Sequence, residues 1–236
     1  MTMKTVLITG GSRGIGAATA AEFGKNGYRV LLTYKNSESA AKELQSRLNA
    51  AGGDVHIFRC DMADTAQIAG LFKQIKTYMR RLDVLVNNVG ISFVGTVEEV
   101  DENALDDMWR TNALSAYTCC RYGLDLLRKS DKPSVVNVSS VWGVCGASCE
   151  VGYSMTKHAL VGLTKSLAEE WMPSGIAVNC VCPPIVRTDM CAHLTEDDVA
   201  DFCAEHDCKA YTAAEVAADI YALATSGESG IILEEK

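Results

Sequence analysis

Tyr153 and Lys157 have the types and the spacing that could perform proton chemistry. On a helix, residues four apart lie on one face, so the phenol and the ammonium are expected to be neighbours. At ~4 Å and an effective dielectric of about 20, the cation favours the phenolate by about 4 kcal/mol, roughly three pKa units. The pKa of Tyr153 is therefore expected to fall from about 10 to about 7, where the phenol exchanges protons with a carbonyl or an alcohol.

Two polar residues upstream could complete such a site. Ser140 follows the apolar run Ser134–Val138, and ligands of parallel sheets bind where the strands end. Its hydroxyl could hold a substrate oxygen. Asn112 could bind a water that relays protons to Lys157, although its spacing alone favours a simpler interpretation, a helix amide with satisfied hydrogen bonds.

A glycine-rich segment, Thr9–Gly16, follows the first apolar run and precedes a helical pattern. Gly10 permits a sharp turn, Gly14 lets the backbone approach a pyrophosphate, and Gly16 permits close packing of helix and strand. The helix start offers free N–H groups to phosphates, with Ser12 and Ile15 in the same loop. The segment predicts a dinucleotide site, although an ordinary glycine-rich turn has a similar composition.

Charges near the second strand indicate which dinucleotide binds. In NAD-binding units an acidic residue ~20 residues after the loop binds the ribose 2′-hydroxyl. Here Leu32–Ser37 contains no carboxylate, and it offers Tyr34 and Lys35 instead; Arg13 lies in the loop itself. Two cations without a carboxylate suit a 2′-phosphate, which favours NADP(H) unless both are only solvated surface charges.

Short apolar runs alternate with segments of helical period, which predicts an α/β fold: a single-domain, doubly wound parallel sheet over residues 1–236, with helices on both faces. The predicted strands are Lys4–Thr9, Arg29–Thr33, Val55–Arg59, Val84–Asn87, Ser134–Val138 and Ala177–Val181. The predicted helices are Ile15–Asn26, Ser39–Ala51, Thr65–Met79, Asn103–Leu127 and Tyr153–Trp171. A last helix is expected to begin at Thr212, which forms a capping box with Glu215.

Composition narrows the function classes. The chain of 236 residues is 48% apolar and has a net charge of −8, which argues against disorder and against nucleic acid or an anionic membrane as a partner. No apolar stretch approaches the ~20 residues that span a bilayer. The ten cysteines lie partly in apolar runs and indicate a reducing cytoplasm. The pairs Cys145/Cys149 and Cys203/Cys208 lack zinc-site spacing, so no metal is expected.

Taken in order, these motifs resemble the short-chain dehydrogenase/reductase family over nearly the whole chain. The resemblance implies a Rossmann-type sheet, a nicotinamide cofactor and a catalytic tetrad of Asn112, Ser140, Tyr153 and Lys157. It implies that Asn87–Gly90 steadies the sheet and the cofactor, and that Asp61 binds the adenine. Further cofactor contacts are implied at Met62, Asn88, Gly90, Pro183, Val186 and Thr188, beside Tyr153 and Lys157.

The sequence departs from the family pattern in three places. Val89 replaces an alanine, and Pro184 replaces a glycine, which removes an N–H and fixes φ near the expected nicotinamide. The residues after Ser229 make an abbreviated last strand, which puts the usual subunit contacts in doubt. A homotetramer or homodimer is still expected, because Asn103–Leu127 and Tyr153–Trp171 are apolar on more than one face.

The Gly-Gly-Ser-Arg-Gly-Ile-Gly loop and the run Thr164–Ala168 are most similar to the 3-oxoacyl-acyl-carrier-protein reductase branch. This predicts NADPH-dependent reduction of a small-molecule or carrier-bound ketone. An acidic carrier requires a basic patch, and Asp131 interrupts the candidate patch Arg128–Lys132, which weakens this interpretation.

Two alternatives stay open. Trp142-Gly143 and Gly146–Val151 resemble the same positions in reductases of the 5-aminopentanone group on a modified lysine of elongation factor P. There Glu150 would face an amine rather than be an exposed loop carboxylate. A non-enzymatic NADP-binding sensor or scaffold is the third hypothesis, although it has no need of an activated phenol. The expected substrate cap, Met190–Lys209, gives no recognisable selectivity pattern; its His193 and His206 are expected to be solvated or to belong to a lid.

Overall fold

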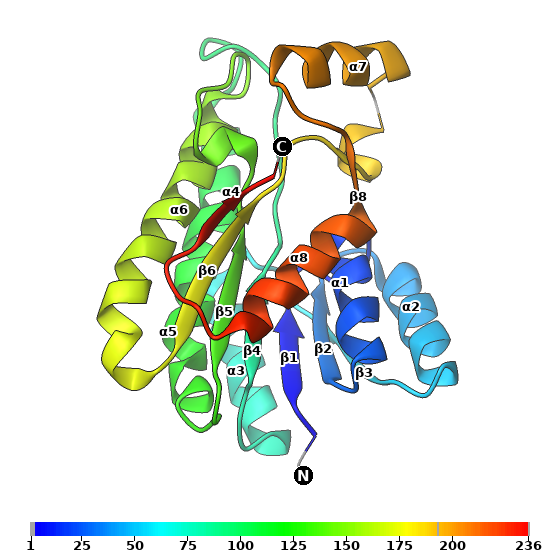
Figure 1. The fold of residues 1–236 in the computed structure, drawn as a ribbon, viewed down its shortest axis with the longest axis vertical. Coiled ribbons are helices and arrows are strands. Elements are labelled where there is room, and N and C mark those ends of the chain that lie inside the picture. The colour runs from blue at the N-terminus through cyan, green and yellow to red at the C-terminus, as the bar shows by residue number, and fades with distance from the viewer. Residues whose placement is uncertain (1–2, 193, 236) are drawn as a thin grey trace.

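Seven parallel strands form one sheet in the order β3-β2-β1-β4-β5-β6-β9 (Figure 1). The computed structural model describes residues 3–192 and 194–235, so the predicted lid residue His193 lies outside the described residues. The strands are β1 Thr5–Ile8, β2 Arg29–Tyr34, β3 Asp54–Arg59, β4 Val84–Asn87, β5 Ser134–Val138, β6 Ala177–Cys182 and β9 Ile232–Glu234. The strand order reverses between β1 and β4, which makes the sheet doubly wound, as predicted.

Helices cover both faces of the sheet because its strands are apolar on both sides. Val6 and Ile8 of β1 pack in the core shared with α1, α2 and α8, whereas Leu7 points into the core shared with α3, α5 and α6. The helices are α1 Gly14–Lys25, α2 Glu38–Ala50, α3 Thr65–Tyr78, α4 Glu102–Met108, α5 Ser115–Leu127, α6 Val151–Trp171, α7 Glu196–Glu205 and α8 Ala213–Ser226. Thr212 and Glu215 form the predicted capping box of α8.

Three features differ from the sequence prediction. The predicted helix Asn103–Leu127 is divided into α4 and α5 by a π-helical turn, Trp109–Leu114, in which the wider i→i+5 hydrogen bonding inserts an extra residue that the sequence periodicity does not show. Helix α7 was not predicted, although its Thr195–Asp198 capping box is visible in the sequence. A short ladder joins β7 (Val186–Arg187) to β8 (Tyr211–Thr212).

The last strand is short: β9 has three residues and pairs with the end of β6. No helix of the described residues has the length and apolar character needed to cross a membrane. In the same part of the chain, no group of three or more His, Cys, Asp or Glu side chains is arranged to hold a metal ion.

Candidate active site

The glycine-rich loop joins β1 to α1 at the carboxyl edge of the sheet. Gly10 and Gly14 have φ values of +64° and +53°, in the left-handed region where glycine carries no steric penalty. A Cβ on Gly16 would lie 2.3 Å from the carbonyl oxygen of Gly10, so a side chain there would collide with the loop. The loop is thus a backbone cradle at a helix N-terminus, which fits a pyrophosphate.

Side chains from neighbouring strands brace this cradle. The Asn88 amide donates to the carbonyl oxygens of Thr9 at 2.8 Å and of Gly10 at 3.1 Å. Thr188 lies on the other side, where its methyl would be 3.4 Å from a Cβ on Gly14. The structure therefore places Asn88 and Thr188 beside the loop, and the Asn88 amide holds the loop's shape; their implied contacts with the cofactor stay predictions.

The adenosine end of the predicted site is a polar cavity of about 390 Å³ lined by Lys35, Asn36, Arg59, Asp61 and Gln67. Lys35 Nζ forms an ion pair with Asp61 Oδ2 at 2.8 Å, which offsets the charge of both predicted residues. Arg59 was not predicted from the sequence as a cofactor-binding residue. It ends β3 opposite Tyr34 and donates to the Lys35 carbonyl at 3.3 Å, and it forms no ion pair among the described residues.

The predicted phosphate-binding residue Arg13 lies elsewhere. It precedes α1, and its guanidinium pairs with Asp189 at 3.8 Å with both side chains mostly exposed. Such an exposed pair contributes little stability, so Arg13 can turn towards an anion at small cost. Arg13 does not line the cavity that holds Lys35 and Arg59.

The predicted catalytic residues Tyr153 and Lys157 lie together on the buried face of α6, as their spacing predicted. Tyr153 and Lys157 are 9% and 3% exposed, and Lys157 Nζ lies 5.4 Å from the centre of the Tyr153 ring. The ammonium donates to the carbonyl oxygen of Val138 at 2.9 Å. Ser140 Oγ accepts from the N–H of Trp142 at 3.2 Å, and the same hydroxyl lies close enough to the Tyr153 phenol to lower its pKa. A phenol, a hydroxyl and an ammonium therefore converge at the end of β5.

The expected pKa of Tyr153, near 7, is wrong for this structure. Burial raises the pKa of Tyr153 above its usual value, the negative charge of Glu150 raises it further, and the hydrogen bond with Ser140 lowers it. The Lys157 ammonium is directed at Val138 instead of the phenol oxygen. Burial also lowers the pKa of Lys157 to about 8. The sequence estimate assumed a partly solvated pair, and this pair is buried.

Asn112 lies in the π-helical turn and faces the same site. Its amide donates to the Ile91 carbonyl and accepts from the Ile91 N–H, both at 2.8 Å, and it donates to Thr156 Oγ1 at 3.0 Å. A Cβ on Gly90 would lie 3.6 Å from Asn112 Oδ1 and 3.5 Å from Lys157 Nζ. The Asn112 amide is thus fully hydrogen-bonded and also lies near Lys157. A structural role for Asn112 and the predicted role in a proton relay are therefore compatible.

Helix α7 forms a lid above the carboxyl edge of the sheet (Figure 1). Phe202 of α7 and His206, at the C-terminal cap of this helix, have rings 5.6 Å and 5.0 Å from the ring of Trp142, two residues after Ser140. The Pro183 carbonyl, just before the unusual Pro184, accepts from the N–H of Val141 at 2.9 Å and holds this turn. The contact of these lid rings with Trp142 could not be predicted from the sequence, because periodicity does not indicate which segments lie together in space.

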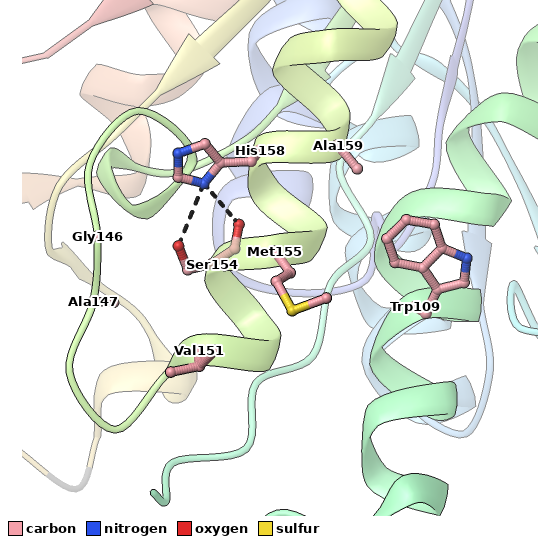
Figure 2. Close-up of a pocket in the computed structure, with 8 residues that line it drawn as sticks. All are labelled: Trp109, Gly146, Ala147, Val151, Ser154, Met155, His158 and Ala159. Carbon is pink, nitrogen blue, oxygen red and sulfur yellow. Dashed lines mark hydrogen bonds between the residues drawn. The ribbon is translucent and has the colours of Figure 1, made fainter. Parts of the chain in front are cut away.

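A second hollow, of about 550 Å³, lies on the exposed side of α6 (Figure 2). Trp109, Val151 and Met155 line it and are each about half exposed. His158 is tied to Ser154 of the same helix at its edge. Tyr153 and Lys157 do not line this groove, so it is a separate apolar surface rather than the catalytic site.

Comparison with known proteins gives consistent results. A family model described as short chain dehydrogenase matches residues 4–199. An uncharacterized oxidoreductase of Bacillus subtilis is 37% identical over 202 residues, 84% of this chain and 82% of that protein. A 3-oxoacyl-[acyl-carrier-protein] reductase of Staphylococcus aureus is 32% identical over 194 residues, 82% of this chain and 79% of that protein.

Solved structures agree over nearly the whole length. A short-chain dehydrogenase/reductase from Serratia marcescens superposes with a TM-score of 0.90 at 30% identity, covering 98% of this chain and 95% of the other. A blue fluorescent protein from a metagenomic library, in complex with NADPH, gives a TM-score of 0.90 at 27% identity, with coverages of 98% and 95%.

Proposed function

Because the chain belongs to the short-chain dehydrogenase/reductase family, we propose that it is an NADPH-dependent reductase that converts a ketone to a secondary alcohol. The observation that carries this proposal is the buried convergence of Ser140, Tyr153 and Lys157 at the carboxyl edge of the sheet. A binding module has no use for such a set. The glycine cradle and the cavity of Lys35 and Arg59 fit a dinucleotide with a 2′-phosphate.

Each residue of the site has a definite part in this reaction. The glycine-rich loop at the carboxyl edge of the sheet would hold a nicotinamide dinucleotide, which would supply the hydride when bound in its reduced form. Tyr153 donates a proton to the carbonyl oxygen, and its raised pKa keeps the phenol protonated at neutral pH. Ser140 holds the same oxygen. Lys157 and Asn112 lie behind the phenol, where a water held by Asn112 can return the proton to Tyr153.

The preferred substrate class is a 3-oxoacyl group on a carrier, by analogy with the reductases that this chain resembles. The test is a steady-state screen with NADPH in which acetoacetyl thioesters, small neutral ketones and aminopentanone-bearing peptides are compared by kcat/KM. Preference for the thioester supports the proposal. Tight NADPH binding with no turnover of any ketone would leave the sensor hypothesis instead.

A second candidate is the reduction of a 5-aminopentanone group on a modified lysine of elongation factor P. It is favoured by the position of Glu150, whose carboxylate accepts from the Trp142 indole at 2.9 Å and raises the pKa of Tyr153 by its charge. A carboxylate with an aromatic neighbour attracts an ammonium group and repels an anionic carrier. In the same screen this candidate requires the amine-bearing ketone to exceed a neutral ketone of equal length by about tenfold in kcat/KM, or roughly 1.4 kcal/mol.

We also propose that the chain forms a homo-oligomer through the groove on α6, in a reducing compartment such as the cytoplasm. The groove presents Trp109, Val151 and Met155 to solvent, and all ten cysteines are free. A second copy could bury these side chains about a twofold axis. Light scattering at micromolar concentration should give a dimer or tetramer, which Met155→Glu should dissociate; a monomeric wild type would refute the proposal.

A further inference from the structure

Resting on the proposed function, we propose that Glu150 is a positioning residue that joins the two loops of the substrate entrance and sets the charge environment of Tyr153. Its carboxylate accepts from Ser92 Oγ at 2.7 Å and from Trp142 Nε1 at 2.9 Å. Ser92 lies after β4, and Trp142 lies in the turn after β5. One side chain therefore holds together two segments that are 50 residues apart.

The backbone before Glu150 is strained in a way that serves this position. Cys149 has a φ of +57°, although it is not a glycine, and its carbonyl accepts from the Gly95 N–H at 2.7 Å. A non-glycine residue in the left-handed region costs of the order of 1 kcal/mol and persists where its surroundings require it. The strained turn thus directs Glu150 towards Ser92 and Trp142.

Helix capping does not explain Glu150. It occupies the N-cap position of α6, yet its side chain makes no hydrogen bond to the first turn of the helix. Both carboxylate oxygens point to other segments instead. Glu150 is also linked to the lid through the Trp142 indole, because Phe202 and His206 pack against that ring.

The charge of Glu150 also acts on the phenol. The titratable groups that face Tyr153 are Glu150, Lys157 of the same helix and Cys191 from the turn Asp189–Cys191. Glu150 raises the pKa of Tyr153, which favours the protonated form that reduction requires. Removing this charge should lower the pKa of the phenol, so the rate of reduction should fall at a lower pH than in the wild type.

The central test is Glu150→Gln, which keeps an acceptor and removes the charge. With NADPH and a neutral ketone, the alkaline limb of the kcat profile should move to lower pH, because the negative charge that raises the pKa of Tyr153 has been removed. Trp142→Phe keeps the charge and the ring but loses the hydrogen bond; it should leave the pH profile in place and raise KM. Glu98→Gln, an exposed carboxylate in the loop after β4, is the matched control and should change neither.

A second readout separates this inference from the proposed function. Phenolate absorbance is titrated in the wild type and in Glu150→Gln, each with Tyr153→Phe subtracted, so that only Tyr153 contributes and no substrate is needed. A lower phenol pKa in Glu150→Gln supports the inference even if no ketone is reduced. Superimposable titrations in the two proteins, with folding confirmed by circular dichroism, would overturn it.

Discussion

Two regions of the predicted site differ in how they are built. The floor, here the buried residues Tyr153 and Lys157, lies on a single helix of 21 residues, whereas the entrance consists of several short segments. The entrance combines the three-residue turn Val141–Gly143, the strained Cys149 and the ten-residue helix α7. Reacting atoms need fixed positions, which a long packed helix provides. Short surface segments change more freely, so we expect the floor to determine the reaction class and the entrance to determine which substrate is accepted.

The largest effect on kcat should come from removing the proposed proton donor of the floor, Tyr153. Tyr153→Phe removes the phenol oxygen and keeps the ring, so kcat should fall by the 10²–10⁴-fold typical of a lost general acid. NADPH affinity should stay nearly unchanged, because the glycine cradle is intact. Steady-state kinetics and fluorescence titration measure the two quantities. Tyr117→Phe, on the exposed side of α5, is the control; retention of more than about a hundredth of kcat in Tyr153→Phe would show that another group donates the proton.

The same contrast explains which features of the site could be predicted from the sequence. The glycine cradle and the Tyr153–Lys157 pair were predictable because each depends on a few neighbouring residues in one element. Arg59 was not, since its relation to Lys35 exists only through the pairing of β2 with β3. The pKa of Tyr153 was predicted in the wrong direction because it depends on burial and on the Val138 carbonyl, neither of which the spacing contains.

The buried charge of Lys157 should lower the free energy of unfolding of the protein. The variant Lys157→Met, which removes this charge, measures the size of the effect. Burial lowers the pKa of Lys157 from 10.5 to about 8, so the folded protein binds this proton less tightly than the unfolded chain. At about 1.4 kcal/mol per pH unit, the charged lysine costs of the order of 3 kcal/mol below pH 8. Lys157→Met should therefore raise the free energy of unfolding at pH 7 while it abolishes activity.

The pH dependence makes this test specific. As pH rises from about 8 to 10.5, the wild type loses the buried charge and gains stability relative to the variant, so the difference should shrink across that window. Urea unfolding at several pH values measures it. Lys165→Met, an exposed lysine on the same helix, should give a small difference that does not vary with pH. A variant less stable than the wild type at pH 7 would contradict the prediction.

At the adenosine end, Arg59→Ala should weaken NADPH binding about tenfold or more and leave NADH binding unchanged, since a charge-assisted hydrogen bond contributes about 1.5–3 kcal/mol. Lys35→Ala should have a smaller effect, because Asp61 already neutralises Lys35 at 2.8 Å. Dissociation constants for both cofactors provide the measurement, with Arg47→Ala on α2 as the control. Equal affinities for the two cofactors in the wild type would remove the basis for NADPH selectivity.

The smallest effect is expected at the entrance, where Phe202→Ala removes one ring from the lid. Phe202 packs edge-on against Trp142, with ring centres 5.6 Å apart, and such a pair contributes about 0.5–1.5 kcal/mol. Because Phe202 packs on Trp142 and we expect the lid to cover the bound substrate, KM should rise by roughly two- to twelvefold while kcat changes little. Tyr78→Ala, an exposed ring at the far end of α3, should alter neither constant. A fall in kcat comparable to that of Tyr153→Phe would mean that the lid orders the catalytic groups themselves, and the division between floor and entrance would no longer hold.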